Sequence, residues 1–300
     1  MDTPRGVVTE RQFEIVEPRS AESPVVVEVP HAGLSIDPET LLNLVAPARS
    51  IARDADLHVD ALWQDAPSEG ATLLFARASR FVVDLNRSET DFDDGAVEGG
   101  GRTPWPRGVI WRLTTDGEPM LATRLTRAEL ERRLRLIHRP YHAKLTEIIE
   151  RKRKIFGFAI LLCAHSMPTE GRRGGTDLRG IAGMRADLVP GTRGRTTAAA
   201  SLIDAVEAHA RGIGWSVVHD HPYRGGYSTG HYGMPERNVH AIQLEVARRL
   251  YMEEATLRIR PDGFRTVREF ARTLVARFAV TTAETLAGAA SNGGALARRT

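Results

Sequence analysis

The stretch Leu161-Leu162-Cys163-Ala164-His165-Ser166-Met167-Pro168 places a histidine directly after a short apolar run that predicts a buried strand. An upstream stretch has the same form, because Val25-Val26-Val27-Glu28-Val29-Pro30 leads straight into His31-Ala32-Gly33. In open α/β sheets, ligands gather just beyond the carboxyl ends of parallel strands. The two histidines are therefore expected to share one site, and two imidazoles at neighbouring strand ends indicate a metal.

Strand and helix patterns alternate along the chain, which favours an α/β fold with a mostly parallel, mixed central sheet flanked by helices. Strands are expected at 24–29, 71–76, 80–85, 108–113, 158–164, 214–219 and 239–246. Helices are expected at 38–49, 55–65, 126–154, 196–211 and 263–281. Pro140 predicts a kink that divides the long helix into two pieces, because proline lacks the amide donor and clashes with the preceding turn.

The chain of 300 residues, 42% of them hydrophobic, is long enough to bury a large core. Residues 1–286 are expected to form a single domain, and the small, polar residues 287–300 a flexible tail. Segments 88–107 and 168–195 show no regular pattern, and each follows a strand end that carries polar residues. Loops of that length inside a compact domain are usually binding segments or lids.

Composition argues against two classes of partner. The formal net charge is only +3, and the aromatic residues, 6% of the chain, are not interleaved with the basic ones, so no nucleic-acid partner is expected. No apolar run of about eighteen residues and no secretory signal pattern occurs, which predicts a soluble, cytoplasmic protein without a membrane partner. The single Cys163 lies in an apolar run and is expected to be a packed, unreactive thiol. The sequence leaves the oligomeric state open.

A zinc site needs more than two histidines. Zinc in hydrolytic sites usually takes three protein ligands, mixing histidine with a carboxylate, and leaves a fourth position for water. Asp54, Asp56 and Asp60 lie on a predicted helix that begins near Arg53. Asp56 stands opposite the other two on the helical wheel and is the predicted third ligand. The alternative is that it caps or solvates the start of the helix.

Two other histidine pairs compete for the metal. His138 and His142 have the i, i+4 spacing that places two imidazoles on one helical face, although Pro140 between them disturbs that geometry. His219 and His221 flank an aspartate, and a strand would point both to the same side. Lining a pocket wall is the alternative role for this second pair.

Two further apolar runs carry polar residues that need an explanation. Segment 81–87 ends in Asp84, Asn86 and Arg87. An arginine at a pocket rim can bind a substrate carboxylate through two hydrogen bonds, and an ion pair between Asp84 and Arg87 is the alternative. Glu245 lies inside the apolar run 241–246, where an unpaired charge is costly to bury. Such a residue needs a proton, a cation or a catalytic role.

Over roughly residues 20 to 255 the chain resembles the N-formylglutamate amidohydrolases, which are similar in fold to the zinc carboxypeptidases and the aspartoacylase group. The motifs that carry this resemblance, in chain order, are Pro30-His31-Ala32-Gly33, Asp84-Leu85-Asn86-Arg87, Pro140-Tyr141-His142, His165-Ser166-Met167-Pro168, Pro222-Tyr223-Arg224-Gly225-Gly226-Tyr227, Tyr232-Gly233 and Gln243-Leu244-Glu245. The resemblance implies a zinc carboxypeptidase-like, phosphorylase/hydrolase-like fold.

The resemblance also implies one zinc ion per chain, held by two histidines and a carboxylate. The histidines match His31 and His165, and the carboxylate matches Asp56 or, as the alternative, Asp54. Zinc carboxypeptidases take the carboxylate three residues after the first histidine, but that position is Leu34 here, so the ligand must come from elsewhere.

For the reaction, the resemblance implies that Asn86 and Arg87 bind the substrate's carboxylate and that Glu245 is the general base. The expected reaction converts N-formyl-L-glutamate into formate and L-glutamate, a late step of histidine catabolism. The alternatives are hydrolysis of another N-acyl amino acid or small peptide, and a metal-free carboxylate-binding or regulatory protein on the same scaffold. A glutamate side chain would need a second carboxylate contact, and the candidates are the arginines of the 168–195 segment, Arg172, Arg173, Arg179, Arg185 and Arg193.

Overall fold

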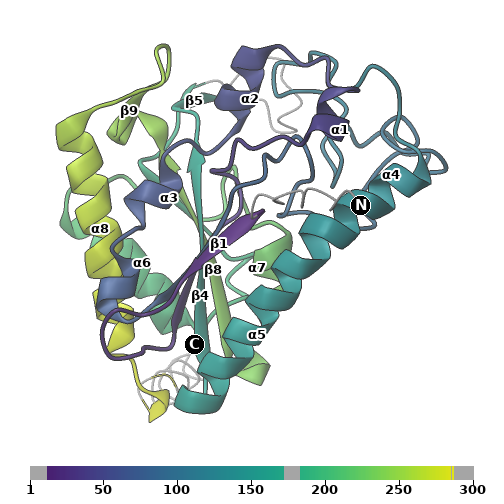
Figure 1. The fold of residues 1–300 in the computed structure, drawn as a ribbon. Helices are drawn as coiled ribbons and strands as arrows, with labels where there is room; N and C mark the ends of the chain where they lie inside the picture. The colour runs from purple at the N-terminus through teal and green to yellow at the C-terminus, as the bar shows by residue number, and fades with distance from the viewer. Residues whose placement is uncertain (1–11, 172–182, 285, 287–300) are drawn as a thin grey trace, which may run out of the picture.

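The computed structural model describes residues 12–171, 183–284 and 286. Its centre is a six-stranded sheet in the order β1-β3-β2-β4-β8-β7 (Figure 1). The strands are β1 (Phe13–Val16), β2 (Val25–Val29), β3 (Thr72–Ala76), β4 (Ala159–Met167), β7 (Leu188–Gly191) and β8 (Val239–Ala247). The four inner strands run parallel, and β1 and β7 pair antiparallel at the two edges. The predicted α/β fold with a mostly parallel, mixed sheet is confirmed.

Strand order places the site. From β2 the chain moves outward to β3, and it later returns to β4 on the other side of β2. The crevice at the carboxyl ends of β2 and β4 is therefore the switch point of the sheet, where ligands bind in open α/β folds. His31 follows β2 after a single proline, and His165 lies near the end of β4. Sheet topology thus brings the two predicted histidines together.

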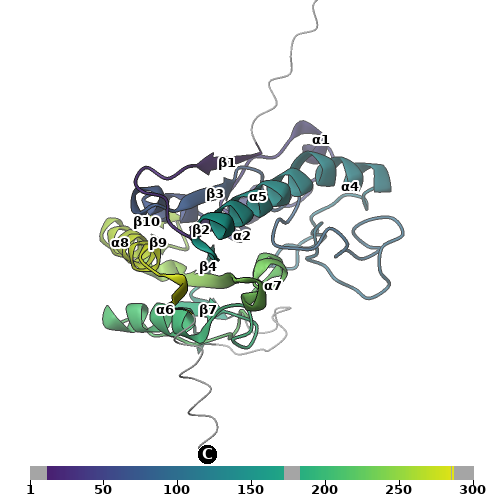
Figure 2. The ribbon, with the colours of Figure 1, turned by 90° about the horizontal axis from the view of Figure 1, so that it is seen from below.

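Helices cover both faces of the sheet. The α-helices of the described residues are α1 (Pro38–Leu41), α2 (Ala48–Asp54), α3 (Val59–Leu62), α4 (Arg127–Arg133), α5 (Arg139–Phe156), α6 (Ala200–Gly212), α7 (Tyr227–Tyr232) and α8 (Pro261–Ala279). Figures 1 and 2 show α6 and α8 on one side of the sheet and α4 and α5 on the other. Because both faces are covered, alternate residues of β4 enter different core clusters, Ile160 and Leu162 with α6 and α8, and Leu161 and Cys163 with α5. Cys163 is buried, as predicted.

The long helix is interrupted as expected, but by a π-helical segment. Leu134–His138 joins α4 to α5, and Pro140 is in the first turn of α5. Proline cannot donate a hydrogen bond to the turn before it, and π-helical segments are one way in which helices adjust their backbone pairing. The interruption therefore lies just before the proline.

Three predicted strands are wrong. Segment 80–85 is irregular and contains turns, 108–113 forms bends with isolated bridges at Trp111 and Leu113, and 214–219 contributes only a bridge from Val217 to Leu188. The edge position belongs instead to β7, which lies inside the predicted loop 168–195, and β1 was also missed. Val82 and Val109 are fully buried all the same. An apolar run indicates burial, and burial alone does not separate a packed loop from a strand.

Two predicted helices are also wrong in extent. The 38–49 prediction contains α1 and only the start of α2, because Pro47 disfavours helical backbone in the residue before it. Within 55–65 only α3 is helical, since Asp56 lies in non-helical backbone and His58 has a left-handed φ of 67°. The helix expected to carry Asp54, Asp56 and Asp60 therefore does not exist as one element.

Short β-pairs complete the described chain, β5 (Glu170–Gly171) with β6 (Gly183–Met184), and β9 (Met252–Glu253) with β10 (Arg258–Ile259). Segment 88–107 is irregular, as predicted, and is organised by buried Asp93, which accepts from the amides of Ala96 and Trp105. No helix within the described ranges is long and apolar enough to cross a bilayer. The predicted tail 287–300 lies outside the described residues, and the single-domain boundary at 286 stays a prediction.

Candidate active site

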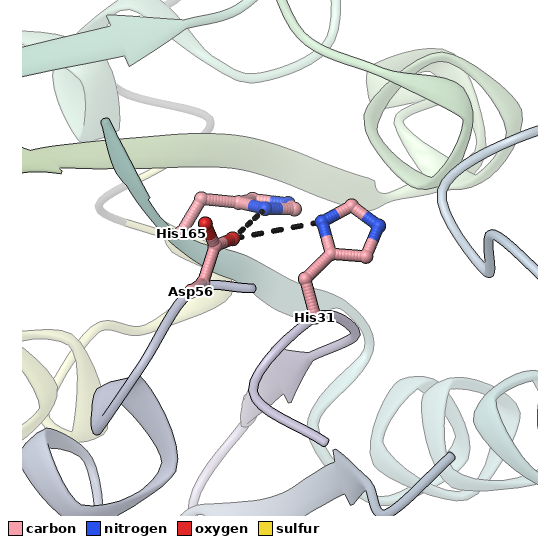
Figure 3. A group of neighbouring side chains, drawn as sticks. All are labelled: His31, Asp56 and His165. Carbon is pink, nitrogen blue, oxygen red and sulfur yellow. Dashed lines mark hydrogen bonds and ion pairs between the residues drawn. The ribbon is translucent and has the colours of Figure 1, made fainter. Parts of the chain in front are cut away.

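His31, Asp56 and His165 form a buried group at the switch point (Figure 3). Asp56 Oδ2 lies 3.0 Å from His165 Nδ1 and 3.5 Å from His31 Nδ1. One potential ligand atom from each residue lies within 4.8 Å of the others, and the three side chains are almost completely buried. The structure therefore brings together the three residues that the sequence predicted as metal ligands.

One nitrogen of this group lacks a hydrogen-bond partner. His31 Nε2 lies 2.7 Å from Asp84 Oδ1, whereas the buried His31 Nδ1 makes no hydrogen bond. Buried polar atoms in native proteins nearly always have a partner. Figure 3 shows this nitrogen pointing toward Asp56, on the side where His165 also approaches. A cation among the three side chains would satisfy it, so the residues present fit a metal.

Asp84 fixes His31 through the hydrogen bond to its Nε2. Its Oδ2 accepts hydrogen bonds from Arg80 Nη2 at 2.8 Å and Trp111 Nε1 at 2.9 Å. Although burial acts to raise the pKa of Asp84, the charges of Arg80 and His31 hold it well below its usual range. A carboxylate in this position fixes the tautomer and the orientation of a ligand histidine. The partner of Asp84 in an ion pair is therefore Arg80 and not Arg87.

Asp56 is positioned by contacts from distant segments. Its amide donates to the carbonyl of His31 at 2.9 Å, and Ser166 Oγ donates to its Oδ1 at 3.3 Å. Buried Arg248 donates to the carbonyl of Ala55 at 2.8 Å and lies 3.4 Å from Asp56 Oδ1. Burial acts to raise the pKa of Asp56, but the hydrogen bond from His165 and the proximity of both imidazoles hold it well below its usual range. An ionised carboxylate is the form that binds a cation.

Asp54, the alternative ligand, faces a different partner. Its carboxylate accepts from the amide of Thr115 at 3.0 Å and from the hydroxyl of the same residue. It is the last residue of α2 and does not belong to the histidine group. Of the two aspartates, only Asp56 lies against both histidines.

Glu245 stands beside the group on the next strand. It pairs in register with His165, so the two side chains leave neighbouring strands on the same face. Gln243, two residues earlier, donates from Nε2 to Glu245 Oε1 at 2.8 Å. Burial raises the pKa of Glu245 above its ordinary value. The carboxyl group is therefore a stronger base than an exposed glutamate.

A cavity of about 400 Å³ opens onto these residues, a size that suits a small amino-acid derivative. Its wall carries more arginines than acids. The arginines are Arg53, Arg80, Arg87, Arg107, Arg185, Arg224 and Arg248, and the acids are Asp54, Asp56, Glu170, Glu245 and Glu254. An excess of positive charge in a cleft attracts anionic ligands.

Asn86 and Arg87, which the sequence predicted to bind a substrate carboxylate, line this cavity. The amide of Asn86 is in use within the protein, because Oδ1 accepts from Ser228 N at 3.0 Å and Nδ2 lies 3.3 Å from His165 Nε2. Arg87 donates from Nε to the carbonyl of Arg107 at 2.9 Å and from Nη1 to that of Asn86 at 3.1 Å. Among the described residues its Nη2 has no partner and is available to a ligand.

Three of the four rival histidines have structural roles. The rings of His138 and His142 lie 4.4 Å apart, and their Nε2 atoms each lie 2.9 Å from a backbone carbonyl, those of Arg87 and Leu85. His219 lies between Thr192 Oγ1 and the carboxylate of Glu207. Within the described chain, neither pair belongs to a group of metal-type ligands.

The loop arginines offered by the sequence are only partly described. Arg172, Arg173 and Arg179 lie outside the described residues. Arg185 lines the cavity and donates to the hydroxyl of Tyr223 at 2.9 Å, whereas Arg193 does not line the cavity. Sequence reasoning missed Asp84 as the partner of His31 and Arg248 as a contact of Asp56. The available signal was a charged side chain at the end of a buried run.

A buried His-Asp-His group and a buried glutamate at the switch point of a parallel sheet indicate a hydrolytic enzyme built on an α/β fold. The family model for N-formylglutamate amidohydrolase matches residues 23–252, and the chain belongs to that family of amide hydrolases. The resemblance stated from the sequence motifs is confirmed.

Named relatives agree with this placement. The chain is similar to the N-formylglutamate deformylase of Pseudomonas putida, with 35% identity over 77% of this chain and 82% of that protein. It is 33% identical to the enzyme of the same name from Pseudomonas aeruginosa, over 80% of this chain and 86% of that protein. The crystal structure of N-formylglutamate amidohydrolase from Ralstonia eutropha JMP134 superposes with a TM-score of 0.79 at 32% identity, covering 89% of this chain and 97% of that one.

Proposed function

We propose that this protein is a zinc-dependent amidohydrolase that cleaves N-formyl-L-glutamate to formate and L-glutamate. The observation that carries the metal is the buried His31 Nδ1, which makes no hydrogen bond and faces Asp56 and His165. Two histidines and a carboxylate are the donor set of catalytic zinc sites in hydrolases. The substrate is supported by the two Pseudomonas relatives, which are named N-formylglutamate deformylase.

His31, Asp56 and His165 would hold one zinc ion per chain, which when bound would supply Lewis-acid activation of water and of the scissile carbonyl. Asp84 accepts the Nε2 proton of His31 and so leaves Nδ1 with its lone pair toward Asp56. Asp54 would take no part, because Thr115 occupies its carboxylate.

Glu245 would move the proton. It accepts one proton from the attacking water and later donates it to the nitrogen of the leaving glutamate, while the water oxygen bonds to the formyl carbon and the C–N bond breaks. Its position next to His165 in the β4–β8 register supports this role. The hydrogen bond from Gln243 to Oε1 fixes the carboxylate plane.

Arg87 and Asn86 would orient the substrate. Arg87 Nη2 is available for the α-carboxylate of the formylated amino acid, and charge-assisted hydrogen bonds of this kind are strong and directional. The amide of Asn86 contacts His165 and joins this carboxylate site to the metal ligands. Fixing the carboxylate in this way places the formyl carbon for attack.

Formate release tests the proposal on a panel of N-formyl and N-acetyl amino acids, each with and without added zinc. N-formyl-L-glutamate should be cleaved fastest, chelation should abolish cleavage, and zinc should restore it. A clear preference for another N-acyl amino acid or a small peptide would reassign the substrate. Cleavage at full speed by a chelated sample shown by elemental analysis to hold no metal would disprove the proposed metal dependence.

A further inference from the structure

Arg224 lines the same cavity and is not used by the protein. Within the described part of the chain, its guanidinium makes no hydrogen bond or ion pair. Other cavity arginines are engaged, Arg80 by Asp84, Arg53 by Asp116 and Arg248 by backbone carbonyls. Arg224 therefore presents a complete set of donors to the solvent side of the cavity.

The backbone around Arg224 is held against the active site. Gly226 donates from its amide to Gln243 Oε1 at 2.8 Å, and a Cβ added at Gly226 would lie 2.3 Å from Asn86 Nδ2. This contact explains why a glycine stands there. On the other side, the carbonyl of Arg224 accepts from the amide of Arg193 at 2.7 Å. Arg224 is thus an exposed side chain on a fixed segment beside Asn86.

Two arginines with donors still available, Nη2 of Arg87 and the whole guanidinium of Arg224, flank one contact. Arg87 follows Asn86 directly, and Arg224 precedes by two residues the Gly226 that packs on Asn86. Neither forms an ion pair with a described carboxylate. The cavity acids Glu170 and Glu254 belong to other segments, β5 and the turn after β9. This part of the cavity therefore suits a ligand with two carboxylates.

We propose that Arg224 binds the side-chain carboxylate of the substrate, and that the enzyme is thereby selective for N-acyl derivatives of dicarboxylic amino acids. Arg87 binds the α-carboxylate, so each of the two guanidinium groups binds one of the two carboxylates of the substrate. The inference rests on the proposed function. It assigns to Arg224 the second contact that the sequence placed among the 168–195 arginines, of which Arg185 is engaged with Tyr223.

The test compares N-formyl-L-glutamate with N-formyl-L-glutamine, whose side chain has nearly the same shape without the charge. For wild type, kcat/KM should favour the acid by about 10- to 100-fold, the effect of a charge-assisted hydrogen bond. Arg224→Gln should lower kcat/KM for N-formyl-L-glutamate by a similar factor, mainly through a higher KM. It should leave kcat/KM for N-formyl-L-glutamine unchanged. Arg224→Lys should recover part of the loss on the acid.

Arg237→Gln is the matched control, because Arg237 is also an exposed arginine without a described partner but lies outside the cavity. This variant should have the wild-type kcat/KM for both substrates. Equal losses on both substrates in Arg224→Gln, or no loss on either, would overturn the inference while the amidohydrolase function stood. Equal cleavage of both substrates by wild type would also overturn it. Cleavage of neither by zinc-loaded wild type would overturn the proposed function, and the inference with it.

Discussion

A single histidine nitrogen shows how the site is built at the scale of residues. Asp84 takes Nε2 of His31, so only Nδ1 remains for the space shared with Asp56 and His165. Without Asp84 the ring would be free to turn and to exchange tautomers. The geometry of the candidate metal site therefore depends on a residue that would not itself bind the metal.

Glu245→Gln is the residue-scale prediction. The amide keeps the shape of the carboxylate and can still bond to Gln243, but it cannot accept a proton from water. Turnover should fall by about 10²- to 10⁴-fold, with metal content unchanged. The measurements are kcat for N-formyl-L-glutamate and zinc per chain by elemental analysis.

Glu254→Gln is the matched control, since Glu254 lines the same cavity but bonds to the amide of Thr169. It should keep kcat close to wild type. Wild-type turnover in Glu245→Gln would remove Glu245 from the mechanism, and loss of zinc in that variant would show a structural role instead.

The sequence predicted the site residues that follow from a strand end and missed those that depend on pairing across the chain. His31, His165 and Glu245 lie at or beside buried strand termini, where the apolar run marks their position. The contact between His31 and Asp84 spans 53 residues, and that between Arg248 and Asp56 spans 192. Such contacts exist only once the sheet order is set, so no local pattern indicates them.

At the scale of elements, the helical segment from α4 to α5 fixes the loop that carries Asn86 and Arg87. His142 of α5 contacts the carbonyl of Leu85 and the hydroxyl of Tyr232, both at 2.9 Å. Burial lowers the pKa of His142 to about 3, so the folded protein holds this imidazole neutral. The i, i+4 spacing that suggested a metal pair serves instead to fix the backbone on either side of Asn86.

The prediction at this scale concerns acid stability. In the unfolded chain His142 regains a pKa of about 6.5. Below that pH the imidazole is protonated in the unfolded state but stays neutral in the folded state. The stabilisation is complete above about pH 6.5 and is lost as the pH falls toward 3, by about 1.4 kcal/mol per pH unit. Denaturant unfolding of wild type and His142→Gln from pH 7 to 5 measures it.

The unfolding free energy of the His142→Gln variant should fall less steeply with decreasing pH than that of wild type. The difference in slope should correspond to about one bound proton. NMR titration of the His142 ring gives an independent reading, because the imidazole should stay neutral at pH 5. A ring that titrates near its ordinary pKa in the folded protein would contradict the prediction.

Elements buried on both faces were predictable, and partly paired ones were not. The inner strands β2, β3, β4 and β8 are mostly apolar and buried at every position because helices cover both sides. Segment 80–85 also contains a buried apolar run, Phe81 to Val83, but its backbone is irregular and contains turns. Edge strand β7 pairs with the sheet on one side through Pro190 and Gly191, residues that signal a loop.

At the scale of the whole molecule, the candidate metal site joins segments that are far apart in the chain. His31 follows β2, Asp56 lies between α2 and α3, and His165 belongs to β4. A ligand that binds all three in the folded state and none of them as a set in the unfolded state stabilises the entire fold. Zinc should therefore act on global unfolding and not only on catalysis.

Thermal unfolding of chelator-treated protein, with and without zinc, tests this linkage. At a zinc concentration about 100-fold above Kd the stabilisation should be about 2.7 kcal/mol, which corresponds to a rise in Tm of about 5 °C. Asp56→Ala should lose most of this zinc-dependent rise, because the carboxylate that contacts both histidines is gone. Asp54→Ala is the matched control from the same segment: its Tm without zinc should fall, since the bonds to Thr115 are lost, but the rise on adding zinc should remain. An equal rise in Asp56→Ala and wild type would mean that the third ligand lies elsewhere. A rise lost only in Asp54→Ala would reverse the assignment of the two aspartates.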